Sequence, residues 1–260
     1  MKNKFFAIGS CIIVVIIIIT GVGKIQSKRT SEREAQIISE GRKHLLQLEQ
    51  ADLSIIEEKV EAHHAPVVIV EDDVADIDFK KFFEDTVFMG DSITEGLIDM
   101  EIINKYNVIA GKGDTVIKAK EKIGTLAGIR PKNVVLLYGM NDVIEFDNPS
   151  QSRGPKEFKD SYISFINEIK IKLPKTNIYI QAPLPVNDKA LKINSRLTNE
   201  NLTEFRAIAK EVSEETGVNY VDIDTLVANN DSLHEGDGIH FKYDFYLKWL
   251  TYLQRYMTGK

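Results

Sequence analysis

The chain has 260 residues, of which 43% are hydrophobic and 28% are charged, and its formal net charge is −6. This composition suits one globular domain plus an appendage, with enough length to bury a sizeable core. The acidic balance argues against nucleic acid as a partner, because phosphate binding requires a basic face and the globular part has no dense run of Lys and Arg.

The N-terminal segment, residues 1–25, contains an uncharged apolar run of 18 residues from position 5 to position 22. As a helix this run reaches about 27 Å, close to the thickness of a hydrocarbon core. We expect a single retained transmembrane anchor rather than a cleaved signal peptide, since Gly21-Val22-Gly23 is a weak cleavage site. Basic residues flank both ends of the run and leave the orientation undecided by charge. Because the run resembles an export signal, we expect the globular domain to be extracytoplasmic.

Residues 26–78 are expected to form a helical stalk followed by an acidic linker. The part up to residue 64 is charged, contains no proline and carries an imperfect apolar stripe. Its clean heptads are too few for a dimerising coiled coil, so we favour a solvated stalk with weak self-association at most. Acidic residues gather at 71–78, and their spacing lacks the glycine-turned loop of a calcium-binding EF-hand.

The globular domain is expected at residues 79–260, where strand and helix patterns alternate. Short apolar strands are predicted at residues 86–89, 106–110, 133–138, 177–181 and 219–223. Apolar side chains that step by three and four predict amphipathic helices around residues 158–173, 202–212 and 245–253. The run 134–137 is apolar at every position, as in a parallel strand covered on both faces. This alternation predicts an α/β fold with a doubly wound, five-stranded parallel sheet.

Polar clusters follow the predicted strands, at the edge where such sheets bind ligands. They read Gly-Asp-Ser at 90–92, Gly-Lys-Gly-Asp-Thr at 111–115, Gly-Met-Asn-Asp at 139–142 and Asp-Gly-Ile-His at 237–240. Each cluster alone is also ordinary turn or helix-cap chemistry. Together, and in this order, they indicate one functional site.

Ser92 is a candidate nucleophile, and a serine hydroxyl needs a neighbouring base to remove its proton. Three of the five histidines lie in the predicted stalk, which leaves His234 and His240. Asp237 precedes His240 by three residues, a spacing that lets its carboxylate accept the Nδ1 proton and orient the ring. His234 is expected to be a loop residue.

Acyl transfer also needs hydrogen-bond donors for an oxyanion. The Ser92 N–H, the Asn141 side-chain amide and a glycine N–H from Gly111 or Gly113 are candidates. A metal site built from His234, Asp237 and His240 is the weaker interpretation, because the spacing matches no standard zinc motif. Cys11 is the only cysteine and lies in the apolar run, so the domain has no thiolate ligand. We expect neither a metal nor a cofactor.

The four blocks, spread from about residue 86 to the C-terminus, resemble those of the SGNH (GDSL-type) serine hydrolase superfamily, and the anchor suggests a membrane-bound bacterial member. The resemblance implies a flavodoxin-like three-layer sandwich. It also implies a triad of Ser92, His240 and Asp237, with Ser92, Gly113 and Asn141 as the oxyanion hole. One departure is conservative: Ile93 stands where the family motif has Leu.

The resemblance implies an esterase that hydrolyses short acyl (acetyl) esters, on a small molecule or on cell-envelope carbohydrate. Two alternatives stay open. An O-acyltransferase would use the same triad with a sugar hydroxyl in place of water. A non-catalytic envelope scaffold on this fold would have no need of intact Ser92, Asn141, Asp237 and His240 together. No residue in the sequence separates hydrolysis from transfer.

Overall fold

A computed structural model of the protein describes residues 77–146, 154–228 and 230–259. The predicted anchor and all but the last two residues of the predicted stalk and linker lie outside these ranges. Within them, no helix has both the length and the apolar character needed to cross a membrane.

The five predicted strands form one parallel sheet in the order β2-β1-β3-β4-β5. Their bounds are Thr86–Gly90 for β1, Val108–Ala110 for β2, Asn133–Leu137 for β3, Asn177–Gln181 for β4 and Asn219–Val221 for β5. The predicted α/β fold with a doubly wound, five-stranded parallel sheet is therefore confirmed. Because the chain moves from β1 to β2 on one side and then to β3 on the other, the winding reverses between β1 and β3, where such folds bind ligands.

The second strand is shorter than predicted, because residues 105–107 form a 3₁₀ turn, η2 (Lys105–Asn107). The Asn107 side-chain amide reaches three carbonyl oxygens before and within β1. It lies 3.3 Å from Phe83 O, 2.8 Å from Glu84 O and 2.8 Å from Thr86 O. These tertiary hydrogen bonds draw Asn107 out of the strand.

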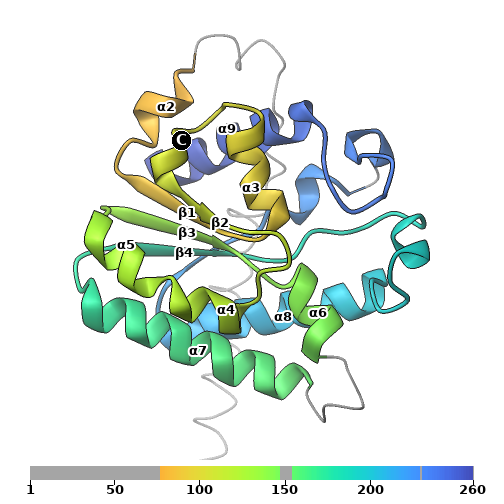
Figure 1. Ribbon diagram of the computed structural model, residues 1–260, viewed down its shortest axis with the longest axis horizontal. Coiled ribbons are helices and arrows are strands. Elements are labelled where there is room, and N and C mark those ends of the chain that lie inside the picture. The colour runs from red at the N-terminus through yellow and green to blue at the C-terminus, as the bar shows by residue number, and fades with distance from the viewer. Residues whose placement is uncertain (1–76, 147–153, 229, 260) are drawn as a thin grey trace, which may run out of the picture. The chain divides into compact units, whose positions relative to one another are not determined.

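Helices cover both faces of the sheet and give three layers (Figure 1). One face carries α2 (Phe79–Phe82), α3 (Ser92–Asp99) and α9 (Tyr243–Thr258). The other carries α4 (Val116–Glu121), α5 (Ile123–Ile129), α7 (Pro155–Lys172) and α8 (Asn199–Thr216), and α6 (Met140–Phe146) packs against α7 and α8. Thr198 caps the start of α8 and Gly217, at φ 62°, ends it, as a left-handed glycine commonly does at a helix C-terminus.

A column of aromatic rings joins α9 to the sheet. Phe241 stacks on Phe245 with ring centroids 4.2 Å apart, Phe245 stacks on Trp249 at 5.7 Å, and Trp249 meets Phe88 of β1 edge-on at 6.1 Å. The Trp249 indole N–H also donates to Gln181 Oε1 of β4 at 3.0 Å. Each ring is fully buried. The column therefore fixes the chain around residue 241 against the centre of the sheet.

Close contact between α3 and α9 depends on a glycine. A Cβ at Gly96 would lie 2.0 Å from the hydroxyl oxygen of Tyr246, which is buried and donates to the carbonyl of Ile93 at 3.0 Å. The missing side chain at Gly96 therefore lets α9 hold the first turn of α3 in place.

We expect Gly96→Ala to destabilise the fold by about 1–3 kcal/mol, because the rigid Tyr246 ring must move and lose its hydrogen bond. Gly124→Ala in α5 is the matched control, since a Cβ there meets nothing within 4 Å. It should stabilise the fold by about 0.4–1 kcal/mol through a less flexible unfolded chain. Thermal unfolding measures both, and shifts of the same sign would contradict this account.

Candidate active site

Ser92 is the first residue of α3 and follows the interior strand β1 after the single residue Asp91. The turn between them is capped by Asp91, whose Oδ1 accepts the Ile93 N–H at 3.0 Å. Tight packing at this point requires Gly90, because a Cβ there would lie 2.0 Å from Thr94 Oγ1 and 2.7 Å from Leu137 O. The hydroxyl of Ser92 therefore stands at a helix N-terminus on the edge where the parallel strands end, and folds of this type bind ligands at that edge.

His240 lies within hydrogen-bond distance of both Ser92 and Asp237. Its Nε2 is 2.9 Å from Ser92 Oγ, and its Nδ1 is 2.6 Å from Asp237 Oδ2. The other carboxylate oxygen, Oδ1, accepts the backbone N–H groups of Ile239 at 2.9 Å and His240 at 3.0 Å. The structure thus brings together three predicted side chains, two of which are 148 positions apart.

The electrostatics of Asp237 favour its ionised form. Partial burial acts to raise its pKa, but the hydrogen bonds from the His240 ring and from the two backbone amides outweigh it, so the pKa lies below its ordinary value. An ionised Asp237 keeps the Nδ1 proton on His240 and leaves Nε2 as the acceptor for the Ser92 hydroxyl.

The site is open to solvent. The side chain of His240 is 40% exposed and that of Asp237 is 32% exposed. The turn that carries them needs Gly238, which has φ 78° and whose Cβ would lie 2.1 Å from Asn187 Oδ1.

Asn141 lies in the first turn of α6, after β3, and its amide points to the turn that carries Ser92. Its Nδ2 is 3.2 Å from Asp91 Oδ2. The preceding Gly139 has φ 129°, and a Cβ there would lie 2.7 Å from the Pro183 ring. The close approach of Pro183 therefore helps to set where α6, which carries Asn141, begins.

The two glycines left open by the sequence differ in their hydrogen bonds. The Gly111 N–H donates to Gly90 O at 3.3 Å and so continues the ladder between β1 and β2. Gly113 has φ 73°, its carbonyl accepts the Lys118 ammonium at 2.7 Å, and its own N–H has no partner among the described residues. This difference favours Gly113 as the candidate donor.

Two fully buried carboxyl groups lie beneath these residues, and sequence reasoning assigned neither a role. Burial raises the pKa of Asp91 to about 7, against the opposing effects of the Ile93 hydrogen bond and the nearby His240. Burial also raises the pKa of Asp142 to about 8, with a further contribution from the charge of Asp91. Asp142 Oδ1 accepts the Val116 N–H at the start of α4 at 2.9 Å. The sequence signal for a role of Asp91 and Asp142 was that each stands next to a candidate site residue, Ser92 or Asn141.

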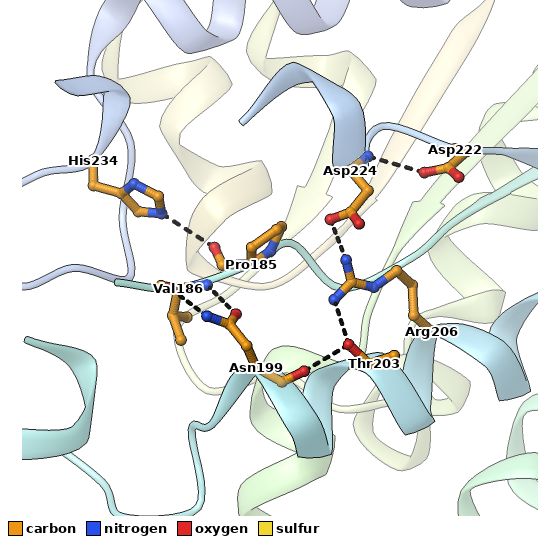
Figure 2. Close-up of polar contacts among 8 residues, drawn as sticks. All are labelled: Pro185, Val186, Asn199, Thr203, Arg206, Asp222, Asp224 and His234. Atoms are coloured by element: carbon orange, nitrogen blue, oxygen red, sulfur yellow. Dashed lines mark hydrogen bonds and ion pairs between the residues drawn. The ribbon is translucent and has the colours of Figure 1, made fainter. Parts of the chain in front are cut away.

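His234 is buried and serves the fold. Its Nε2 donates to the Pro185 carbonyl at 3.1 Å (Figure 2), and its ring packs on Phe241 with centroids 4.6 Å apart. The sequence predicts only a loop residue here. Across the described ranges, no group of three or more His, Cys, Asp or Glu is placed to hold a metal ion.

The segment after β4 connects the two halves of the site, and Figure 2 shows how α8 holds it. Asn199 accepts the Val186 N–H at 3.0 Å and donates to the Val186 carbonyl at 2.9 Å. Further along, the Asn187 N–H donates to the Gly238 carbonyl at 3.1 Å. Because Pro183 also packs against Gly139, this segment supports both the Asn141 turn and the turn of Asp237 and His240.

The chain is similar to known proteins of one family. The family model described as "GDSL-like Lipase/Acylhydrolase family" matches residues 88–246. A GDSL-like lipase from Bacteroides thetaiotaomicron is 16% identical with a TM-score of 0.55, covering 67% of this chain and 87% of its own. A lipase/acylhydrolase from Enterococcus faecalis is 18% identical with a TM-score of 0.51, covering 67% and 95%.

A third solved structure is a catalytic mutant of an acetylxylan esterase from Geobacillus stearothermophilus. It is 18% identical with a TM-score of 0.50, covering 65% of this chain and 92% of its own. At these identities the solved structures show a common fold. No curated protein matches the chain.

The buried Asp142 gives the fold a pH dependence. The folded state holds the Asp142 proton up to about pH 8, whereas an unfolded carboxyl releases it near 3.8. The contribution of the protonated Asp142 to stability is therefore present at low pH and is lost as the pH rises from 3.8 to about 8. Asp91 acts in the same direction up to about pH 7. We expect the free energy of unfolding to fall between about pH 5 and about pH 8.5, and to fall less in Asp142→Asn.

Urea unfolding followed by the fluorescence of Trp249, the only tryptophan, measures this difference. Asp160→Asn, at an exposed position on α7, is the matched control and should keep the wild-type pH dependence. If Asp142→Asn and wild type showed the same pH dependence, the raised pKa of the buried Asp142 carboxyl group would be wrong.

Proposed function

Because the chain belongs to the GDSL-like lipase/acylhydrolase family, we propose that it is a serine esterase with Ser92 as nucleophile, His240 as general base and Asp237 as the orienting carboxylate. The observation that carries the proposal is the continuous hydrogen-bonded line through the three side chains, 2.9 Å from Ser92 Oγ to His240 Nε2 and 2.6 Å from His240 Nδ1 to Asp237 Oδ2.

The reaction proceeds through an acyl-enzyme. As the Ser92 hydroxyl attacks the ester carbonyl, its proton passes to His240 Nε2, and Asp237 stabilises the resulting imidazolium. His240 then returns the proton to the leaving alcohol. In the second half, His240 activates a water molecule that releases the acid and restores Ser92.

Three donors are proposed for the oxyanion: the Ser92 N–H at the start of α3, the Gly113 N–H and the Asn141 amide. The first comes from a helix N-terminus, where the backbone N–H groups are free and the helix dipole favours negative charge. The Gly113 N–H is supported as the second donor because the N–H of the alternative, Gly111, is already used in a hydrogen bond to Gly90 O.

For the substrate, we propose a short acyl group, most simply acetyl, on a carbohydrate of the cell envelope. The solvent exposure of His240 and Asp237 supports a bulky, hydrated acceptor that stays outside the protein. The acetylxylan esterase of similar fold acts on an acetylated glycan, which supports this substrate class by analogy. The predicted N-terminal anchor supports an envelope location.

Ser92→Ala should abolish turnover of p-nitrophenyl acetate by the full-length chain in non-ionic detergent, because the nucleophile is gone while the fold is kept. Ser164→Ala, at an exposed serine on α7, is the matched control and should retain wild-type turnover. Wild type should prefer the acetyl ester to a long-chain one. Undiminished esterase activity in Ser92→Ala would refute the assignment of the nucleophile.

The acceptor is tested with an O-acetylated envelope glycan. Ser92-dependent release of free acetate is the expected result. An O-acyltransferase would form the same acyl-enzyme, so acetyl groups appearing on an added sugar acceptor, without free acetate, would replace hydrolysis by transfer. If neither product forms and p-nitrophenyl acetate is also inert, a non-catalytic scaffold becomes the better interpretation.

A further inference from the structure

Asp91 uses its two carboxylate oxygens for different partners. Oδ1 accepts the Ile93 N–H at 3.0 Å and caps α3, while Oδ2 faces the Asn141 Nδ2 at 3.2 Å. The residue is 1% exposed. A buried carboxylate is costly, and a serine or asparagine would cap the helix as well. The contact with Asn141 is therefore the part of its role that capping does not explain.

A side-chain amide has two ends of opposite character. The NH₂ group donates and the carbonyl oxygen accepts, and a rotation of about 180° exchanges them. An ionised carboxylate only accepts hydrogen bonds, so it tolerates the NH₂ end and repels the carbonyl end. With one N–H of Asn141 held by Asp91, the second N–H stays available to a reacting oxygen.

We propose that Asp91 is a positioning residue that fixes the amide orientation of Asn141, so that Asn141 presents a donor and not an acceptor to the oxyanion. This inference rests on the proposed esterase function and adds to it a residue that touches neither the substrate nor the base. Asp91 acts only through Asn141.

The charges around Asp91 decide at which pH its carboxylate is ionised and fixes the amide orientation of Asn141. His240 stabilises the ionised carboxylate, while burial and the charge of Asp114, in the loop after β2, oppose it. Asp114 is itself paired with the Lys122 ammonium. With the Asp91 pKa at about 7, the carboxylate is ionised above neutral pH, and below it a protonated Asp91 can donate to a reversed Asn141 amide. The Asn141 amide is therefore held most firmly in its donor orientation above neutral pH.

The substitution Asp91→Asn separates the two roles of Asp91, which are to orient the Asn141 amide and to cap α3. Asn caps helices as well as Asp, so its oxygen stays on the Ile93 N–H and its NH₂ group is turned toward Asn141. Two donors then face each other, and Asn141 relieves the conflict by reversing its amide. We expect kcat for p-nitrophenyl acetate to fall by about 10²–10³-fold, as for loss of one oxyanion donor, with little change in KM.

The matched control is Asp99→Asn, an exposed position in the last turn of the same helix, which should keep wild-type kcat. The melting temperature of Asp91→Asn should stay near that of wild type or above it, since the cap is kept and a buried charge is removed. Wild-type kcat in Asp91→Asn would overturn the proposal.

A double-mutant cycle tests whether Asp91 acts through Asn141. Adding Asp91→Asn to Asn141→Ala should lower kcat no further, because the amide to be oriented is already gone. Independent losses that multiply would show that Asp91 has a separate, structural role and would also overturn the proposal.

A readout that needs no turnover separates this inference from the proposed function. The NMR signals of the Asn141 side-chain NH₂, assigned by their absence in Asn141→Ala, should titrate with a midpoint near the Asp91 pKa of about 7 in the Ser92→Ala protein. Adding Asp91→Asn should remove that titration. Signals that ignore pH, or that titrate equally without the carboxylate, would overturn the Asp91 assignment even if Ser92-dependent esterase activity is found. If the Asn141 signals titrate through Asp91 but no Ser92-dependent esterase activity is found, the role of Asp91 in orienting Asn141 stands and the esterase function is refuted.

Discussion

Parallel pairing of β1 between β2 and β3 is the constraint on which the site depends. Parallel strands end at the same edge of a sheet, so the groups that follow β1, β2 and β3 meet there: Ser92, Gly113 and Asn141. Gly90 lets β1 approach β3 closely enough for this, since any Cβ would strike the Leu137 carbonyl. His240 comes from beyond β5 and needs its own support. The aromatic column that begins at Phe241 supplies it by reaching β1 through Trp249.

Much of this arrangement follows from sequence because its signals are local. Apolar runs gave the five strands, and the three- and four-residue steps gave α7, α8 and α9. The turn blocks located Ser92, Asn141 and the Asp237–His240 pair, which the structure brings to one edge. The anchor and stalk lie outside the described residues and stay predictions.

What sequence reasoning missed depends on contacts between distant segments. The shortening of β2 arises from Asn107 reaching carbonyls more than 20 positions away, which no window of residues can show. The choice between Gly111 and Gly113 rests on a ladder hydrogen bond to Gly90. Asp91 and Asp142 read as ordinary turn residues, because an acidic side chain in a turn is normally solvated. Their burial depends on contacts between distant segments, such as the hydrogen bond from the Val116 N–H to Asp142.

The separate support of His240 has a consequence for how the protein fails under stress. Ser92 and Asn141 follow two interior strands of the sheet. The turn with Asp237 and His240 lies beyond β5, and it is attached by the Asn187–Gly238 hydrogen bond, by backbone hydrogen bonds to residues 233 and 235, and by one column of rings. Segments with few such attachments open locally at a lower free energy than the whole fold. A brief opening of this turn parts His240 from Ser92 while the sheet stays intact. We therefore expect mild heating to separate His240 from Ser92 by a local opening that reverses on cooling and precedes denaturation of the domain.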